Sequence, residues 1–359
     1  LELINCEACG KHNYISNYTK IDIALSEFCN LTCQMCRRPS YAVFMDKDWC
    51  KSVLTECAAI GIKTISFSGG EPFVHKGVYE ILDHAFSLNL KVQLVTNGTL
   101  FRAEQTPYFE KLDCCTVSLD GLAEAHDKIR GKVGSWERTI KTLKMFTERD
   151  IQWGTNTVIQ KDNYDQIYDL FKFIQDFGGR KYAYCGFSNV EVVPETVHLQ
   201  LSKEEEAIAH AQVMRIKEEC KKTNTWFNDD VLLSKYFERF ADKNTRVRPY
   251  DGCTVPTKFI GFSAHGFYPC WHIGKALKNK SLIEALMSQE AKEIIAQGLD
   301  KKCVGCNTFN YSWDEEWVAG IAKSFDHNEN ISLGVVALPN PFEQQLSGAT
   351  SGNTVEVDW

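Results

Sequence analysis

The sequence predicts an α/β fold built on a parallel sheet, either open or curled into a partial barrel, and three observations support it. Short apolar runs typical of β-strands recur through the first half of the chain. Between them lie stretches whose apolar residues recur every three or four positions, as in helices covered on one face. Six such strand–helix units follow one another, which favours right-handed crossovers and one parallel sheet. The expected strands are residues 21–25, 62–67, 92–95, 115–119, 153–159 and 182–187.

Helical periodicity is clearest after the first and the fifth strands. Trp49, Val53 and Cys57 fall on one face of the first helix, and residues 167–177 repeat the same spacing with Ile, Leu and Phe. The stretch from 201 to 242 is also helical in pattern, but its charges are typical of a solvated face.

Composition and charge limit the classes of protein. The chain has 359 residues, of which 44% are hydrophobic and 24% charged, and these values are ordinary for a globular protein of two to three domains. The net charge of −7 argues against a broad nucleic-acid face, because phosphate binding depends on clustered Lys and Arg. The chain shows neither an apolar run of membrane-spanning length nor a secretory leader, so we expect a cytoplasmic protein.

The chain divides into five segments by composition and motif. Residues 1–20 carry a Cys-x2-Cys pair, and residues 21–200 hold the strand–helix core. Residues 201–250 form a helical connection and residues 251–310 a cysteine-bearing region. Residues 311–359 are a tail with clusters of Gly, Asn, Pro and Ser.

Fifteen cysteines are an abnormal number for such a chain, and without a leader they indicate metal ligation or catalysis rather than disulfides. Cys29, Cys33 and Cys36 form a Cys-x3-Cys-x2-Cys array directly after the first strand. Three thiolates can bind three irons of a cubane cluster and leave the fourth iron open to a small molecule. A structural zinc site is the alternative, but it requires four ligands and no fourth is adjacent.

A second motif, Ser68-Gly69-Gly70-Glu71-Pro72, ends the second strand. Its glycines permit a close backbone approach, and its carboxylate can accept hydrogen bonds from an ammonium group. Reactive residues of parallel α/β folds lie at the carboxyl ends of the strands, so we expect the two motifs to meet at one edge of the sheet.

In this order and position, the two motifs resemble those of the radical S-adenosylmethionine (SAM) superfamily, over about residues 21–187. The resemblance implies a partial (β/α)6 TIM-like barrel. It also implies that Cys29, Cys33 and Cys36 ligate a [4Fe–4S] cluster whose open iron chelates SAM. Reductive cleavage of SAM would give a 5′-deoxyadenosyl radical that abstracts hydrogen from a substrate.

The resemblance assigns further residues to SAM. Gly69, Gly70 and Glu71 would hold its amino group, and Met35 would pack against adenine. Other residues at the strand ends are expected at the cofactor site, namely Pro72, Asn97, Ser118, Asp120, Arg130 and Asn156. Gln160, like Asn156, is a candidate for contact with adenine or with the substrate.

Three of these residues carry a specific expectation. Ser118 and Asp120 would turn a hydroxyl and a carboxylate toward the ribose, and Arg130 would pair with the carboxylate of SAM. The alternatives are a turn capped by Asp120 and Gly121, and an arginine on the surface.

A second set of cysteines lies in the carboxyl-terminal half. Residues 264–270 predict a hairpin-like turn, and residues 252–307 resemble the Twitch-type auxiliary domain, a reduced form of the SPASM extension. The resemblance implies one closed auxiliary [4Fe–4S] cluster, with structural zinc as the alternative. The four ligands would be Cys253, Cys270, Cys303 and Cys306.

Three further cysteines are candidates for a functional role. Cys6 and Cys9 form half of a zinc knuckle, so zinc at the amino terminus is an option. Cys185 lies near the end of the sixth expected strand, where a thiol could give a hydrogen atom to a substrate radical. A buried structural cysteine is the alternative there.

These observations predict an oxidoreductase-type radical SAM enzyme that oxidises or cross-links a peptide or protein residue. Dehydrogenation or epimerisation of a small sugar-like or natural-product molecule is one alternative, and an iron–sulfur electron carrier is another. The open iron and the Gly-Gly-Glu-Pro segment argue against a carrier. The expected partners are the substrate and an electron donor such as flavodoxin or ferredoxin, with no membrane and no nucleic acid.

Overall fold

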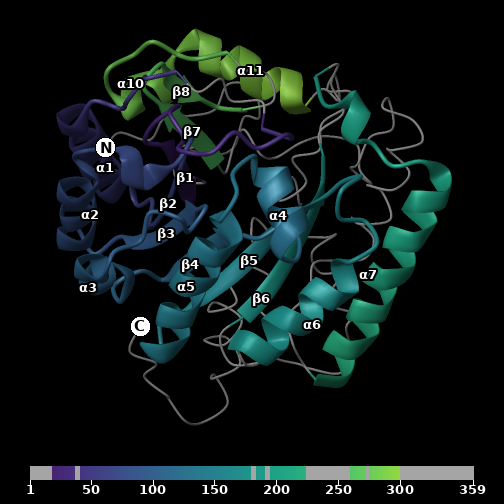
Figure 1. The fold of residues 1–359 in the computed structure, drawn as a ribbon. Coiled ribbons are helices and arrows are strands. Elements are labelled where there is room, and N and C mark those ends of the chain that lie inside the picture. Colours follow the sequence, from purple (N-terminus) through teal and green to yellow (C-terminus); the bar gives the residue numbers. More distant parts are fainter. Residues whose placement is uncertain are drawn as a thin grey trace, which may run out of the picture.

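The computed structural model describes residues 18–36, 41–178, 183–190, 195–223, 259–271 and 275–299. Figure 1 shows strands β1 to β6 side by side, with helices α1, α2, α6 and α7 outside them. The strands are β1 (Lys20–Ala24), β2 (Thr64–Ser68), β3 (Lys91–Thr96), β4 (Cys114–Ser118), β5 (Trp153–Ile159), β6 (Ala183–Asn189), β7 (Phe259–Ser263) and β8 (Gly266–Tyr268). The helices are α1 (Lys47–Ile60), α2 (Val78–Ser87), α3 (Thr106–Phe109), α4 (Ala123–Arg130), α5 (Ser135–Glu148), α6 (Ile167–Gly178), α7 (Lys203–Thr223), α10 (Leu282–Met287) and α11 (Gln289–Leu299), with short 3-10 turns at η2 (Pro72–Val74), η3 (Ala103–Gln105) and η4 (Val197–Leu199).

All the strands join one sheet in the order β6-β5-β4-β3-β2-β1-β7-β8. Strands β1 to β6 pair in parallel, each with the next along the chain. The predicted parallel α/β sheet is therefore confirmed, and each of the six expected strands is present within about two residues of its expected bounds.

The two faces of the sheet differ in polarity because successive side chains of a strand point to opposite sides. Ile23, Phe67 and Leu94 form one register row, are buried, and belong to the apolar core together with residues of the surrounding helices. The alternate row carries Ser66 and Gln93, both buried and polar. The opposite face of the sheet is thus a polar surface directed away from the apolar core.

The described part of the auxiliary region extends this sheet. Strand β7 pairs in parallel with β1, and β8 pairs antiparallel with β7 through the predicted hairpin. Gly266 opens β8 at φ +129°, where an added Cβ would lie 2.1 Å from the Leu277 carbonyl oxygen. The expected auxiliary domain over residues 251–310 stays a prediction. Strand β7 covers the edge of β1 that β2 leaves free, which removes an exposed edge.

Among the described residues, no helix combines the length and the apolar character needed to cross a bilayer.

Candidate functional site

The cysteine array lies in the loop that follows β1. Cys29 and Cys33 are partly buried, Cys36 is exposed, and none of the three is in a disulfide. Burial raises the pKa of both Cys29 and Cys33, and the neighbouring Asn97 and Arg130 act in the opposite direction. The loop therefore places its sulfurs beside donors that favour the thiolate form, which is the form that binds metal.

The glycine motif after β2 packs directly on this loop. Gly70 N donates to the Ser26 carbonyl oxygen at 2.6 Å, and Glu71 N donates to that of Phe28 at 3.0 Å. A Cβ on Gly69 would lie 2.5 Å from Ser26 O, and one on Gly70 only 2.1 Å from Phe28 O. A side chain at either position would push the loop away, so the close approach requires glycine.

The end of α4 holds the same loop from another side. Gln34 N donates to the Ile129 carbonyl oxygen at 2.9 Å, and the Thr32 hydroxyl donates to Gly131 O at 3.3 Å. Lys132 Nζ reaches the Asn30 carbonyl oxygen at 3.3 Å. The array is thus held between the glycine motif and the end of α4.

Glu71 is fully buried, and both of its carboxylate oxygens accept hydrogen bonds from the protein. Thr96 Oγ1 donates to Oε1 at 2.8 Å, and the main-chain N of Asn97 donates to Oε2 at 2.8 Å. Burial raises the pKa of Glu71 to about 7, although these bonds and the N–H of Phe73 oppose the shift. In this structure the carboxylate ties the end of β2 to the end of β3, and its contact with an ammonium group stays a prediction.

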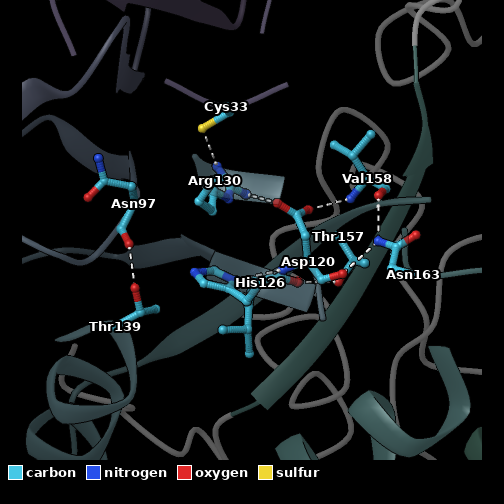
Figure 2. A network of polar contacts seen from close by, with 10 residues as sticks. Cys33, Asn97, Asp120, His126, Arg130, Thr139, Thr157, Val158 and Asn163 are labelled. Atoms are coloured by element: carbon cyan, nitrogen blue, oxygen red, sulfur yellow. Dashed lines mark hydrogen bonds and ion pairs between the residues drawn. The ribbon is translucent and has the colours of Figure 1, made fainter. Parts of the chain in front are cut away.

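Asp120 is buried and forms an ion pair within the protein. Its side chain has no exposed surface, and its Oδ2 lies 2.5 Å from Arg130 Nη2 (Figure 2). Its Oδ1 accepts from Val158 N at 2.8 Å. The carboxylate is therefore held by Arg130 and Val158, and its expected contact with a ribose stays a prediction. Arg130 is likewise not a surface arginine, because only 8% of it is exposed.

Arg130 faces the cysteine array. Its Nη1 lies 3.7 Å from Cys33 Sγ, so it donates toward this sulfur while its Nη2 pairs with Asp120 (Figure 2). Its Nε is buried and has no hydrogen-bond partner in the described part of the chain. One buried N–H beside the cysteines thus remains available to an anionic ligand.

Sequence reasoning missed the residues that fix Asp120. His126 Nδ1 accepts from Asp120 N at 3.2 Å, and burial lowers the pKa of His126 to about 3, so the ring stays neutral. Asn163 Nδ2 donates to the Asp120 carbonyl oxygen at 2.6 Å and to that of Val158 at 2.8 Å (Figure 2). No local pattern marks these two residues, because their partners lie on other elements.

Several other expected residues also lie at this edge. Ser118 and Asn156 are direct register partners on β4 and β5, and both are half-buried. Pro72 opens the short turn η2, and Met35 is half-buried within the cysteine loop. At the end of β5, both polar atoms of the Gln160 side chain are buried without a partner among the described residues.

The remaining expectations receive less support. On β6, Cys185 is the register partner of Thr155, and the next residue, Gly186, is the partner of Asn156. The role of Cys185 as a hydrogen donor stays a prediction. Cys270 is buried just after the hairpin. Five cysteines with expected metal roles lie outside the described residues, namely Cys6, Cys9, Cys253, Cys303 and Cys306.

The residues present fit a cluster bound by three cysteines. No group of three described His, Cys, Asp or Glu side chains is arranged to hold a single metal ion. A cubane makes a different demand, because each cysteine binds its own iron. The glycines that admit the loop and the donors beside Cys29 and Cys33 suit such a group.

Comparison with known proteins agrees with this geometry. Residues 23–174 match the family model for the radical SAM superfamily. An AdoMet-dependent heme synthase of Methanosarcina barkeri is 34% identical over 168 residues, which are 44% of this chain and 47% of that protein. The antilisterial bacteriocin subtilosin biosynthesis protein AlbA of Bacillus subtilis is 31% identical over 168 residues, 45% of this chain and 37% of that one. The chain thus spans less than half the length of either relative.

A solved structure, native anSMEcpe with bound AdoMet and Cp18Cys peptide, superposes with a TM-score of 0.60. The match covers 92% of this chain and 95% of the other at 16% identity, so it supports the fold alone. The motifs and the topology thus agree with the match of residues 23–174 to the family model for the radical SAM superfamily.

Proposed function

We propose that this protein binds a [4Fe–4S] cluster through Cys29, Cys33 and Cys36, and that it oxidises or cross-links a residue of a peptide. When bound, the cluster supplies one electron that cleaves SAM to methionine and a 5′-deoxyadenosyl radical, which takes a hydrogen atom from the substrate. The observation that carries the proposal is the position of the cysteine loop, held between the glycine motif and the end of α4.

The chain's own residues position the reactants. Gly69 and Gly70 admit the loop, and Arg130 has one buried N–H without a partner that can pair with the carboxylate of SAM. Asp120 stabilises the charge of Arg130 at this place. The half-buried polar pair Ser118 and Asn156 lies on the neighbouring strand ends, within the edge where we expect the ribose and adenine.

A direct test measures SAM cleavage by the anaerobically reconstituted protein. We expect the reduced protein to release 5′-deoxyadenosine, and Cys33→Ala to abolish the release because the cluster loses a ligand. Cys57→Ala, which removes a buried thiol of α1 far from the loop in sequence, is the matched control and should retain activity. Full cleavage by Cys33→Ala would contradict the proposal.

The peptide substrate is supported by what two similar proteins are described as doing. AlbA is named for subtilosin biosynthesis, and the anSMEcpe structure holds a peptide. A small-molecule substrate is the second candidate, because the heme synthase matches with similar extent. Incubation with deuterated candidate peptides separates the two, since a peptide substrate transfers deuterium to 5′-deoxyadenosine and a non-substrate does not.

A further inference from the structure

We propose that Asn97 is a positioning residue for the cluster, and that its side-chain amide donates a hydrogen bond to the sulfur of Cys29 and so raises the reduction potential. Asn97 follows β3, and its Nδ2 lies 3.7 Å from Cys29 Sγ. The inference rests on the proposed function, because it concerns the cluster that Cys29 would ligate.

The orientation of the amide follows from its neighbours. Asn97 Oδ1 accepts from Thr99 N at 2.9 Å and from Thr99 Oγ1 at 2.7 Å. Its Nδ2 donates to Asn30 Oδ1 at 2.9 Å. Two donors face one end of the amide and an acceptor faces the other, so the group cannot be flipped without losing these bonds. The N–H end is therefore the end directed at Cys29.

The backbone of Asn97 is fixed as firmly as its side chain. Its N–H donates to Glu71 Oε2 at 2.8 Å, and its carbonyl oxygen accepts from Thr139 Oγ1 at 2.9 Å (Figure 2). Only 6% of the residue is exposed. A donor held in this way needs no rearrangement to reach the sulfur, and little water competes for the bond.

The chemical consequence concerns the charge of the cluster. Reduction adds negative charge to the cluster and its sulfur ligands, and a hydrogen bond to a ligand sulfur stabilises the reduced form more than the oxidised form. Asn97 would therefore ease the electron transfer that precedes SAM cleavage.

Two variants test the effect of Asn97 on the reduction potential to different degrees. Asn97→Ala removes the donor, and Asn97→Asp replaces it with an oxygen that carries negative charge. The matched control is Thr142→Val, because Thr142 Oγ1 donates to the adjacent Gly98 carbonyl oxygen at 2.6 Å and touches no cluster ligand. This control weakens the same loop without changing a donor to sulfur.

The measurement is a redox titration followed by electron paramagnetic resonance. The signal that changes on addition of SAM identifies the cluster with the open iron. At a fixed potential, we expect Asn97→Ala to lower the ratio of reduced to oxidised cluster roughly tenfold, or 59 mV for one electron. Asn97→Asp should lower it further, while Thr142→Val should leave it unchanged.

The outcomes separate this inference from the proposed function. An unchanged potential in Asn97→Ala, or an equal shift in Thr142→Val, would overturn the role of Asn97 while the cluster remains. A wild-type protein that assembles no SAM-responsive cluster would instead overturn the proposed function. Iron content, measured in parallel, shows whether each variant still assembles its cluster.

Discussion

The buried carboxylate of Glu71 joins the ends of β2 and β3, and its raised pKa predicts how the stability of the protein depends on pH. Burial raises the pKa of Glu71 from 4.5 to about 7, so the folded state favours the protonated form. Below pH 4.5 Glu71 is protonated in both states and carries no penalty. Between about pH 4.5 and 7 the unfolded state ionises while the folded state keeps its proton, so stability falls as the pH rises. Above pH 7 the folded state ionises as well, and the loss levels off.

We therefore expect the iron-free wild type to lose about 3 kcal/mol relative to Glu71→Gln between pH 4.5 and 8. Glutamine keeps the size of the side chain and does not titrate. Urea denaturation of both proteins across this range checks the expectation. Parallel stability profiles for the two proteins would show that Glu71 does not titrate in this way.

Residue roles could be predicted from the sequence only where a motif fixes them. The positions of Cys29, Gly69 and Gly70 follow from spacing, and the structure packs the two glycines against Ser26 and Phe28 of the loop that carries Cys29. The ion pair of Asp120 with Arg130 was not predicted, because Arg130 lies in a helix whose placement depends on the whole fold. The buried role of Asp120 therefore had no local signal.

Gly69, at the end of β2, allows this strand end to pack closely on the loop that follows β1, in addition to forming a turn. Gly69 has φ +133° and would place a Cβ 2.5 Å from Ser26 O, whereas Gly61, at the end of α1, has φ +90° and open space around its Cβ position. We expect Gly69→Ala and Gly61→Ala each to cost about 1–3 kcal/mol from backbone strain.

Only Gly69→Ala should also lose iron, because its side chain displaces the loop that carries the cysteines. Thermal denaturation and iron content after reconstitution measure the two effects separately. Equal iron content in the two variants would show that the loop tolerates the displacement.

Element boundaries followed the sequence where the signals are local. Helix α1 begins after Asp46, whose carboxylate accepts from Trp49 N at 2.7 Å, and ends at Gly61. The pairing of β7 with β1 joins segments from opposite parts of the chain. Strand periodicity says which residues are buried and does not name the neighbouring strand, so this pairing could not be predicted.

At the scale of the molecule, the hairpin of β7 and β8 links the auxiliary region to the cysteine loop. His265, in the hairpin turn, lies 2.7 Å from Glu27 through Nε2 and Oε1. Lys278 Nζ donates to the His265 carbonyl oxygen at 2.9 Å. Cys270 follows β8, so an expected auxiliary ligand is attached to the sheet that carries Cys29.

This attachment gives the auxiliary cysteines a testable role. Four thiolates can complete the coordination of a cubane, so a closed cluster at Cys253, Cys270, Cys303 and Cys306 would carry electrons rather than bind substrate. We expect roughly 8 irons per reconstituted chain, and about 4 after Cys303 and Cys306 are both changed to Ala, with SAM cleavage partly retained. Cys57→Ala, on α1, should keep the full iron content. Zinc in place of iron at the four sulfurs would make the region structural, and the electron released by the substrate radical would then need another acceptor.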